Sequence, residues 1–348
     1  MPARARRQPL VLLAPDKLKG TLTARRAVEA LAAAAVETGW DVDRCPLSDG
    51  GEGFREALAP AGAATLRTTV TGPLGAPVEA AWVLEGGRAV VESAAASGLA
   101  LAGGAAGNDP LAATSRGTGE LVLAAVAAGA ADVLVGVGGS ATTDGGLGAV
   151  EAIDAAGGLR RVRVVVACDV ETRFSDAAAA FGPQKGAGPE QVRLLEERLR
   201  ALARQYRERY GVDVEALVGG GAAGGLAGGL AALGARLVPG FDVVARTVDL
   251  PSRLGAADLV VTAEGRLDGP SWQGKVVGGV CRLAAEVGTP ALVVAGSADG
   301  EGRRGAADHG VELVVLDDRF GERAVEEPAA CLAEAARTVL AGGPRSRS

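Results

Sequence analysis

Short apolar runs alternate along the chain with longer segments in which apolar residues recur every three or four positions. The short runs are apolar on both faces, as in strands buried in a parallel sheet, and occupy residues 10–14, 132–137, 163–170, 257–265, 290–297 and 311–317. The longer segments have the period of amphipathic helices and occupy residues 22–39, 115–130, 189–211 and 327–343. This alternation predicts an α/β fold.

Residues 64–93 depart from the alternation. Their β-rich runs are separated by the turns Gly-Pro-Leu-Gly (72–75) and Glu-Gly-Gly (85–87), which is typical of antiparallel hairpins. Hairpins within an α/β pattern predict a second, inserted domain. Residues 218–235 are dense in glycine but keep an apolar period, which predicts a helix packed closely on a neighbour after a loop at 219–221.

Charge, histidine and cysteine content exclude several classes of function. The net charge is −6, so no basic face predicts nucleic-acid binding. No apolar run reaches the roughly 18 residues of a membrane span, and no secretory leader is evident, so we expect a cytoplasmic protein. His309 is the only histidine, which argues against histidine triads and zinc sites. The four cysteines lie far apart and are expected to be reduced.

Lysine is rare in this chain. Of the 36 basic residues only four are lysines, and each lies beside glycine or in a glycine-rich turn: Lys17, Lys19, Lys185 and Lys275. Arginine can replace lysine where charge alone matters, so a retained lysine indicates a place that needs a compact ammonium group. Chance survival on the surface is the alternative interpretation.

A glycine-rich loop follows the apolar run that ends at residue 137. Its backbone can approach a ligand and form an anion nest, and its hydroxyls add donors; the residues concerned are Gly138, Gly139, Ser140, Thr142 and Thr143. The helix expected from Leu147 adds a favourable N-terminal dipole. Neither the Walker A spacing nor the dinucleotide fingerprint is present. Close strand–helix packing, with Asp144 as a helix cap, is the alternative.

Carboxylates follow the predicted strands, at the sheet edge where α/β proteins bind ligands. They are Asp16, Asp49, Glu52, Asp144, Asp169, Glu264 and Asp268. So many carboxylates beside so few ammonium groups predict a divalent cation that bridges phosphates. Phosphoryl transfer to a hydroxyl needs such cations together with a carboxylate base. The candidates for base or metal ligand are Asp49, Asp169 and Asp268, and the candidate cationic clamps are Lys19, Lys185 and Arg116. Capping or a structural ion pair is the alternative for each carboxylate.

Several segments together resemble the type I glycerate kinase family, in the order of that family from about residue 10 to 300. They include APDKLKGTLTA, LSDGGEGF, TSRGTGELV, GVGGSATTDGGLGA, FGPQKGAG, GAAGGLAGGL and DLVVTAEGRLD. The resemblance implies ATP-dependent, Mg²⁺-assisted phosphorylation of D-glycerate, to 2-phosphoglycerate rather than 3-phosphoglycerate. It also implies two α/β domains with the active site in the cleft between them. These are a discontinuous flavodoxin-like parallel-sheet domain (8–63 plus 232–342) and an inserted mixed α/β domain (64–231).

The resemblance also implies roles for single residues. Asp169 is the first choice for the base and Asp49 the second, with Lys19 and Lys185 as catalytic cations. Glycerate and phosphate are expected to be bound by Lys17, Ser48, Glu52, Ser115, Arg116, Gly138, Gly139, Ser140, Thr142, Thr143, Asp144, Gln184 and Lys275. The expected Mg²⁺ ligands are Asp169, Glu264 and Asp268. A homodimer is a further expectation.

Two other functions fit part of the pattern. An NAD-dependent oxidoreductase of a small hydroxy acid explains the glycine loops but not the lysines or the excess of carboxylates. A non-catalytic organic-acid sensor only has to bind its ligand, and binding alone does not require both the lysines and the carboxylates. Three departures from the family bear on substrate preference and oligomer contacts: a short segment at 148–163, ETRFSDAAAA after residue 170, and Ala263 with Trp272 at unusual places.

Overall fold

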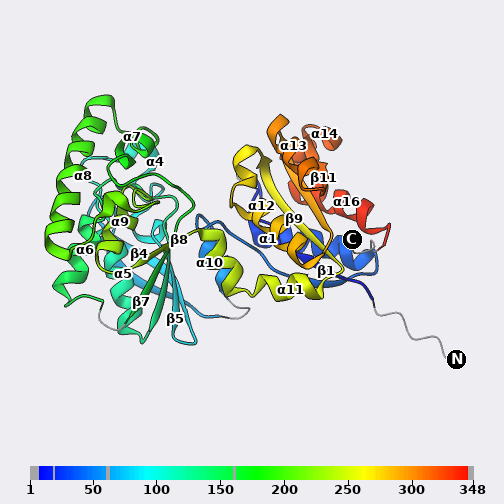
Figure 1. The fold of residues 1–348 in the computed structure, drawn as a ribbon, viewed down its shortest axis with the longest axis horizontal. Coiled ribbons are helices and arrows are strands. Elements are labelled where there is room, and N and C mark those ends of the chain that lie inside the picture. Colours follow the sequence, from blue (N-terminus) through cyan, green and yellow to red (C-terminus); the bar gives the residue numbers. More distant parts are fainter. Residues whose placement is uncertain (1–7, 19, 60–62, 160–161, 344–348) are drawn as a thin grey trace. The chain divides into compact units, whose positions relative to one another are not determined.

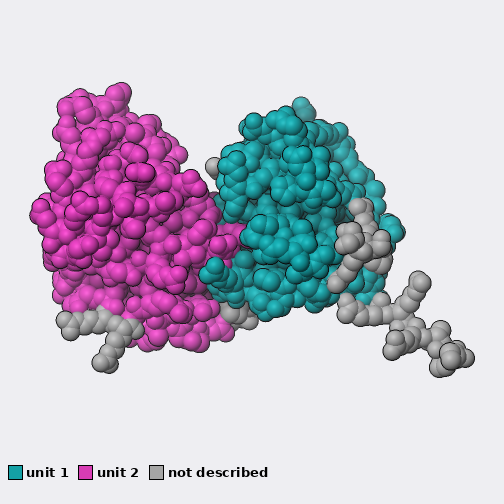
Figure 2. Space-filling model, in the orientation of Figure 1, with its two compact units in different colours: residues 1–49, 244–348 teal, residues 50–243 magenta. Residues whose placement is uncertain are grey.

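The computed structural model describes residues 8–18, 20–59, 63–159 and 162–343. The chain divides into two compact units (Figures 1 and 2), residues 1–49 with 244–348 (unit 1) and residues 50–243 (unit 2). Each unit is an α/β structure with its own sheet and core, so the predicted fold class is confirmed. Among the helices of the described ranges, none is both long and apolar enough to cross a membrane.

Unit 1 contains a five-stranded sheet in the order β11-β10-β9-β1-β2, with every neighbouring pair parallel. Its strands are β1 (Leu10–Leu13), β2 (Asp41–Arg44), β9 (Leu259–Leu267), β10 (Ala291–Ala298) and β11 (Glu312–Val315). Counted along this unit the order is 2-1-3-4-5, which is that of flavodoxin-like folds. The strand order reverses between β1 and β9, and in such sheets ligands bind outside the carboxyl ends of the strands at this switch point.

The helices of unit 1 bury apolar faces against this sheet. They are α1 (Ala24–Glu37), α11 (Leu250–Ala256), α12 (Val276–Val287), α13 (Gly300–Asp308), α14 (Leu316–Phe320), α15 (Arg323–Glu326) and α16 (Pro328–Leu340). Thr23 caps α1 by accepting a hydrogen bond from the amide of Arg26, and Gly39 follows the helix with a φ of 84°. The Trp40 indole donates to Leu340 O (3.0 Å), which ties the end of α1 to the end of α16.

Unit 2 contains a six-stranded mixed sheet in the order β3-β4-β5-β6-β7-β8. Its strands are β3 (Thr65–Thr71), β4 (Pro77–Glu85), β5 (Arg88–Glu92), β6 (Asp132–Gly136), β7 (Arg163–Ala167) and β8 (Arg236–Val238). The first three strands are antiparallel neighbours, which confirms the hairpins expected at 64–93, and the others pair in parallel. The helices are α2 (Phe54–Leu58), α3 (Ala94–Ser97), α4 (Gly104–Gly107), α5 (Arg116–Ala127), α6 (Leu147–Ala155), α7 (Ala177–Phe181), α8 (Pro189–Tyr210) and α9 (Leu226–Ala232); α10 (Gly240–Thr247) ends in unit 1.

The glycine-dense segment 218–235 forms a shorter helix than its apolar period predicts. Only α9 is helical, because Ala223, Gly224 and Gly225 have φ angles of 54°, 68° and 91°. The expected close packing is present. A Cβ at Gly224 would lie 2.0 Å from the carbonyl oxygen of Thr142, and one at Gly229 would lie 2.7 Å from that of Gly145. The glycines are therefore required where this segment contacts the glycine-rich loop.

Candidate active site

The loop between β6 and α6 presents backbone amides that have no acceptor among the described residues. Within the described part of the chain, no hydrogen bond is donated by the N–H groups of Gly138, Gly139, Ser140, Thr142 and Thr143. The loop is anchored through its other groups, since the amide of Ala141 donates to Ser97 O (2.9 Å) and Gly139 O accepts from the amide of Leu99 (2.9 Å). Successive unbonded amides along one turn are a common form of anion-binding nest, so the predicted nest has the donors that it needs. We call residues 138–143 the amide loop.

Lys185 is bound to the amide loop and buried beside it. Its Nζ donates to Ser140 Oγ (3.0 Å) and to Thr142 O (2.6 Å), and the residue is 3% exposed. Burial lowers the pKa of Lys185 to about 8, against the opposing effect of the Asp144 carboxylate. Asn108 holds the two segments together because its amide nitrogen donates to Ala141 O (3.1 Å) and Lys185 O (2.9 Å). A positive charge from a distant part of the chain therefore lies against the loop.

Asp144 joins the starts of two helices. Its carboxylate accepts hydrogen bonds from Ser115 N (2.8 Å), Ser115 Oγ (2.7 Å), Gly146 N (3.0 Å) and Gly148 N (3.3 Å). Ser115 Oγ in turn accepts from the amide of Ala149 (3.1 Å). These bonds fix the N-termini of α5 and α6 against each other, so Asp144 and Ser115 are bonded as caps. Their expected contact with phosphate stays a prediction.

The side chains of the remaining predicted residues of unit 2 make no hydrogen bond to this network among the bonds of the described residues. Asp169 follows β7, and its Oδ1 accepts from the amide of Gly240 (2.6 Å) at the start of α10. Arg116 is exposed and pairs with Glu120 one turn further along α5 (3.0 Å). Glu52 and Gln184 are exposed.

Unit 1 gathers a second set of charged side chains at its topological switch point. Lys17 Nζ lies 3.5 Å from Asp49 Oδ1 and 3.8 Å from Asp16 Oδ1. Burial raises the pKa of Asp16 to about 6, while Lys17 lowers it. Burial likewise raises the pKa of Glu264 to about 7, and the charge of Asp16 adds to that effect. Asp16 was not among the residues predicted to bind or react, although it follows β1 as Asp49 follows β2.

Other predicted residues of unit 1 occupy structural positions. Asp268 caps a short 3₁₀ helix (Gly269–Trp272), where its Oδ1 accepts from the amide and the hydroxyl of Ser271 (3.1 and 3.0 Å). Lys275, the residue before α12, differs from these because its charge acts on both Asp16 and Glu264 and lowers the pKa of each. Ser48 is 1% exposed. Lys19 lies outside the described residues.

A complete metal cage of protein carboxylates is absent from the described ranges, since no group of three His, Cys, Asp or Glu residues there could hold an ion. Magnesium is usually bound by only one or two carboxylates together with water and phosphate oxygens. Glu264 fits such a site, because its Oε1 is buried and has no hydrogen-bond partner among the described residues. Its raised pKa reflects a buried carboxyl group that a nearby cation would favour in the charged form.

A flavodoxin-like sheet in one unit and a charged amide nest in the other define an α/β protein suited to a phosphate-bearing ligand. The chain matches the model of the glycerate kinase family over residues 11–157 and 154–342. It is 36% identical to the glycerate kinase of Bacillus subtilis (91% of this chain, 94% of that protein) and 37% identical to the glycerate 2-kinase of Escherichia coli (82% and 85%). The crystal structure named "putative glycerate kinase 2" from Salmonella typhimurium LT2 superposes with a TM-score of 0.81 at 36% identity, covering 96% of this chain and 98% of that one. The chain belongs to the glycerate kinase family, which confirms the resemblance seen in its motifs.

Proposed function

We propose that the protein transfers the γ-phosphoryl group of ATP to D-glycerate with Mg²⁺, and that the product is 2-phosphoglycerate rather than 3-phosphoglycerate. The observation that carries this proposal is the amide loop, whose N–H groups have no acceptor among the described residues and whose Ser140 hydroxyl and Thr142 carbonyl accept hydrogen bonds from the buried ammonium of Lys185. The names of the relatives support the acceptor, because they include a glycerate kinase and a glycerate 2-kinase.

In this proposal the amide loop stabilises the phosphoryl group as it moves. Negative charge is spread over the oxygens of the transferring group, and fixed N–H dipoles lower the energy of that charge without reorganising. Lys185 adds a full positive charge and holds Ser140 and Thr142 in place. Because its two known bonds are to the loop itself, its main role is to position the amides.

The acceptor hydroxyl needs a group that orients it and takes its proton. Asp169 is the first candidate and Asp49 the second. The bond from Gly240 N fixes the Oδ1 of Asp169, which limits the rotation of its carboxylate. Asp49 is instead paired with Lys17, with Nζ and Oδ1 3.5 Å apart.

Bound Mg²⁺ would supply positive charge between the phosphates. The residues proposed to hold it are Asp169, Glu264 and Asp268, and the structure adds Asp16, which interacts electrostatically with Glu264. Asp268 is already bonded to Ser271, whereas the buried Oε1 of Glu264 has no hydrogen-bond partner in the described chain.

A coupled ADP-release assay tests the proposal, with D-glycerate, L-glycerate, glycerol and water as acceptors and with or without Mg²⁺. We expect ADP release that depends on both D-glycerate and Mg²⁺, and a ³¹P spectrum of the product assigns the phosphorylated oxygen. ADP release that is equal with water and with D-glycerate would refute kinase activity toward glycerate. A 3-phosphate product would correct the position only.

A further inference from the structure

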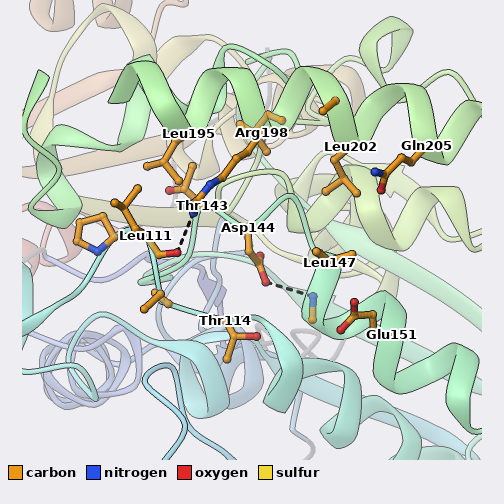
Figure 3. Close-up of a pocket in the computed structure, with 16 residues that line it drawn as sticks. Leu111, Thr114, Thr143, Asp144, Leu147, Glu151, Leu195, Arg198, Leu202 and Gln205 are labelled. Atoms are coloured by element: carbon orange, nitrogen blue, oxygen red, sulfur yellow. Dashed lines mark hydrogen bonds between the residues drawn. The ribbon is translucent and has the colours of Figure 1, made fainter. Parts of the chain in front are cut away.

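A pocket lies beside the amide loop, between α6 and α8 (Figure 3). Its volume is about 430 Å³, which is within the range of small-molecule sites. Residues 110–114 form one side, the end of the loop and the first turns of α6 form another, and α8 forms the third. The Arg198 side chain donates to Leu111 O (3.0 Å), so α8 is fixed to the 110–114 segment across the pocket.

The walls of this pocket are mainly aliphatic. They are formed by Leu111, Leu147, Leu195, Leu199 and Leu202, with smaller contributions from alanines. Leu147 is 38% exposed although it is a large apolar residue at the start of a helix. Flat aliphatic walls of this kind suit a planar aromatic ring, and none of the residues lining the pocket is itself aromatic.

The pocket is continuous with the amide loop. Thr143 and Asp144 line the pocket, and Thr143 is also the last residue of the loop. The Thr143 hydroxyl is buried and has no hydrogen-bond partner among the described residues. A molecule with phosphate groups on the loop and an apolar ring attached to them could therefore occupy both places.

The other end of the pocket is polar. Two polar side chains lie at the end of the pocket away from Thr143 (Figure 3). They are Glu151, one turn beyond Leu147 on α6, and Gln205 on α8. A carboxylate accepts hydrogen bonds and cannot donate them, so Glu151 favours a ring that carries an amino group and disfavours one that carries a carbonyl oxygen there. Among purines, adenine has the amino group at this edge, whereas hypoxanthine has a carbonyl.

We infer that this pocket binds the adenosine part of the phosphoryl donor, with the base between the leucines and its amino group toward Glu151. The inference rests on the proposed function, because it assumes that the phosphates of a nucleotide occupy the amide loop. It assigns recognition of the base to unit 2 and to aliphatic packing.

Calorimetric titration of ADP, adenosine and pyrophosphate into three proteins tests the inference. Ala201→Phe fills the pocket from α8, and Arg204→Phe is the matched control, because Arg204 is exposed on the same helix and does not line the pocket. We expect Ala201→Phe to weaken ADP binding at least about tenfold and to leave pyrophosphate binding within about twofold of the wild type. Arg204→Phe should bind all three ligands normally.

A second variant keeps the test informative if Ala201→Phe disturbs the fold and abolishes pyrophosphate binding as well. Glu151→Gln leaves the pocket open but can donate to a carbonyl oxygen, so we expect its preference for ADP over inosine diphosphate to fall several-fold. An unchanged preference would overturn the assignment of the base edge.

Normal ADP binding by Ala201→Phe would overturn the pocket assignment. Self-association of the wild type that Ala201→Phe abolishes, with ADP binding unchanged, would assign the pocket to a second copy of the chain instead. These binding tests need no glycerate, so their failure is distinguishable from failure of the kinase activity. A wild type that binds ADP in the pocket but does not phosphorylate glycerate would contradict only the proposed function.

Discussion

Replacing Lys185 by methionine should separate the catalytic role of the buried ammonium from its effect on stability. The two hydrogen bonds of Nζ, to Ser140 Oγ and Thr142 O, are each worth about 1.5–3 kcal/mol for a charged donor. Opposing this, a pKa lowered from 10.5 to about 8 means that burial disfavours the charged form by about 3 kcal/mol. The two effects largely offset each other, so Lys185→Met should change the free energy of unfolding by only about 0–3 kcal/mol.

Catalysis should respond far more strongly than stability. The variant loses the positive charge in the amide loop and the bonds that orient Ser140 and Thr142, and loss of one preorganised donor commonly lowers turnover by about 10²-fold. We expect glycerate-dependent ADP release to fall by about that factor, with a thermal midpoint within a few degrees of the wild type. Arg204→Met, which changes an exposed residue of α8, is the control. Turnover within about threefold of the wild type in a folded Lys185→Met protein would refute the positioning role.

The same ammonium predicts a pH dependence. Because the pKa of Lys185 is about 8 in the folded protein, pyrophosphate affinity should fall as the pH rises through 8, and Lys185→Met should lack this transition. The free energy of unfolding should change with pH in the opposite direction to the pyrophosphate affinity. Between about pH 8 and 10.5 the unfolded chain binds more protons at this residue, so its contribution to the free energy of unfolding rises with pH. Pyrophosphate affinity that stays constant from pH 7 to 9.5 would contradict the expected transition.

Three further variants test other parts of the site. Asp144→Ala removes a carboxylate that accepts four hydrogen bonds, and the thermal unfolding should show a loss of about 3–5 kcal/mol; a loss below 1 kcal/mol would contradict the capping role. Gly224→Ala places a Cβ 2.0 Å from a carbonyl oxygen of the amide loop and should prevent folding or abolish pyrophosphate binding. Gly211→Ala, with a similar φ of 72° but no atom within 4 Å, should cost only about 1 kcal/mol, and equal effects of the two would refute the packing argument. Asp169→Asn should lower turnover by about 10²-fold or more with little change in stability, and near-normal turnover would transfer the role of base to another carboxylate.

The strands and helices were largely predictable from the sequence because their apolar periods are local. The hairpins at 64–93 follow from turn residues that act within a few positions. The order of the strands is not a local property, and its expectation came from the family resemblance. The close packing of the segment 218–235 was predicted correctly, but its helix begins later than expected. Glycine adopts a helical or a left-handed conformation equally well, and here the left-handed one occurs where the segment contacts the amide loop.

The site was predictable in part for a compositional reason. Lys185 could be singled out because lysine is scarce, and the amide loop because its glycines and hydroxyls are contiguous. The burial of Lys185 could not be predicted, since its partner Ser140 lies 45 residues away. The pairing of Arg116 with Glu120 could have been expected from their spacing of four in a helix. Asn108 gave no signal, because a lone asparagine in a glycine-rich stretch is ordinarily a turn residue.

The discontinuity of unit 1 has a consequence for how the protein is made. Its first strand β1 leaves the ribosome early, but the neighbouring central strand β9 is encoded far downstream: the bond from Leu10 N to Asp258 spans 248 positions. Residues 50–243 emerge in between as a unit with its own core and can fold while β1 and β2 still lack three of the five strands of their sheet. During synthesis the nascent β1 and β2 therefore expose apolar surface that only the last third of the chain can cover, and this interval is when chaperone binding or aggregation would act on them.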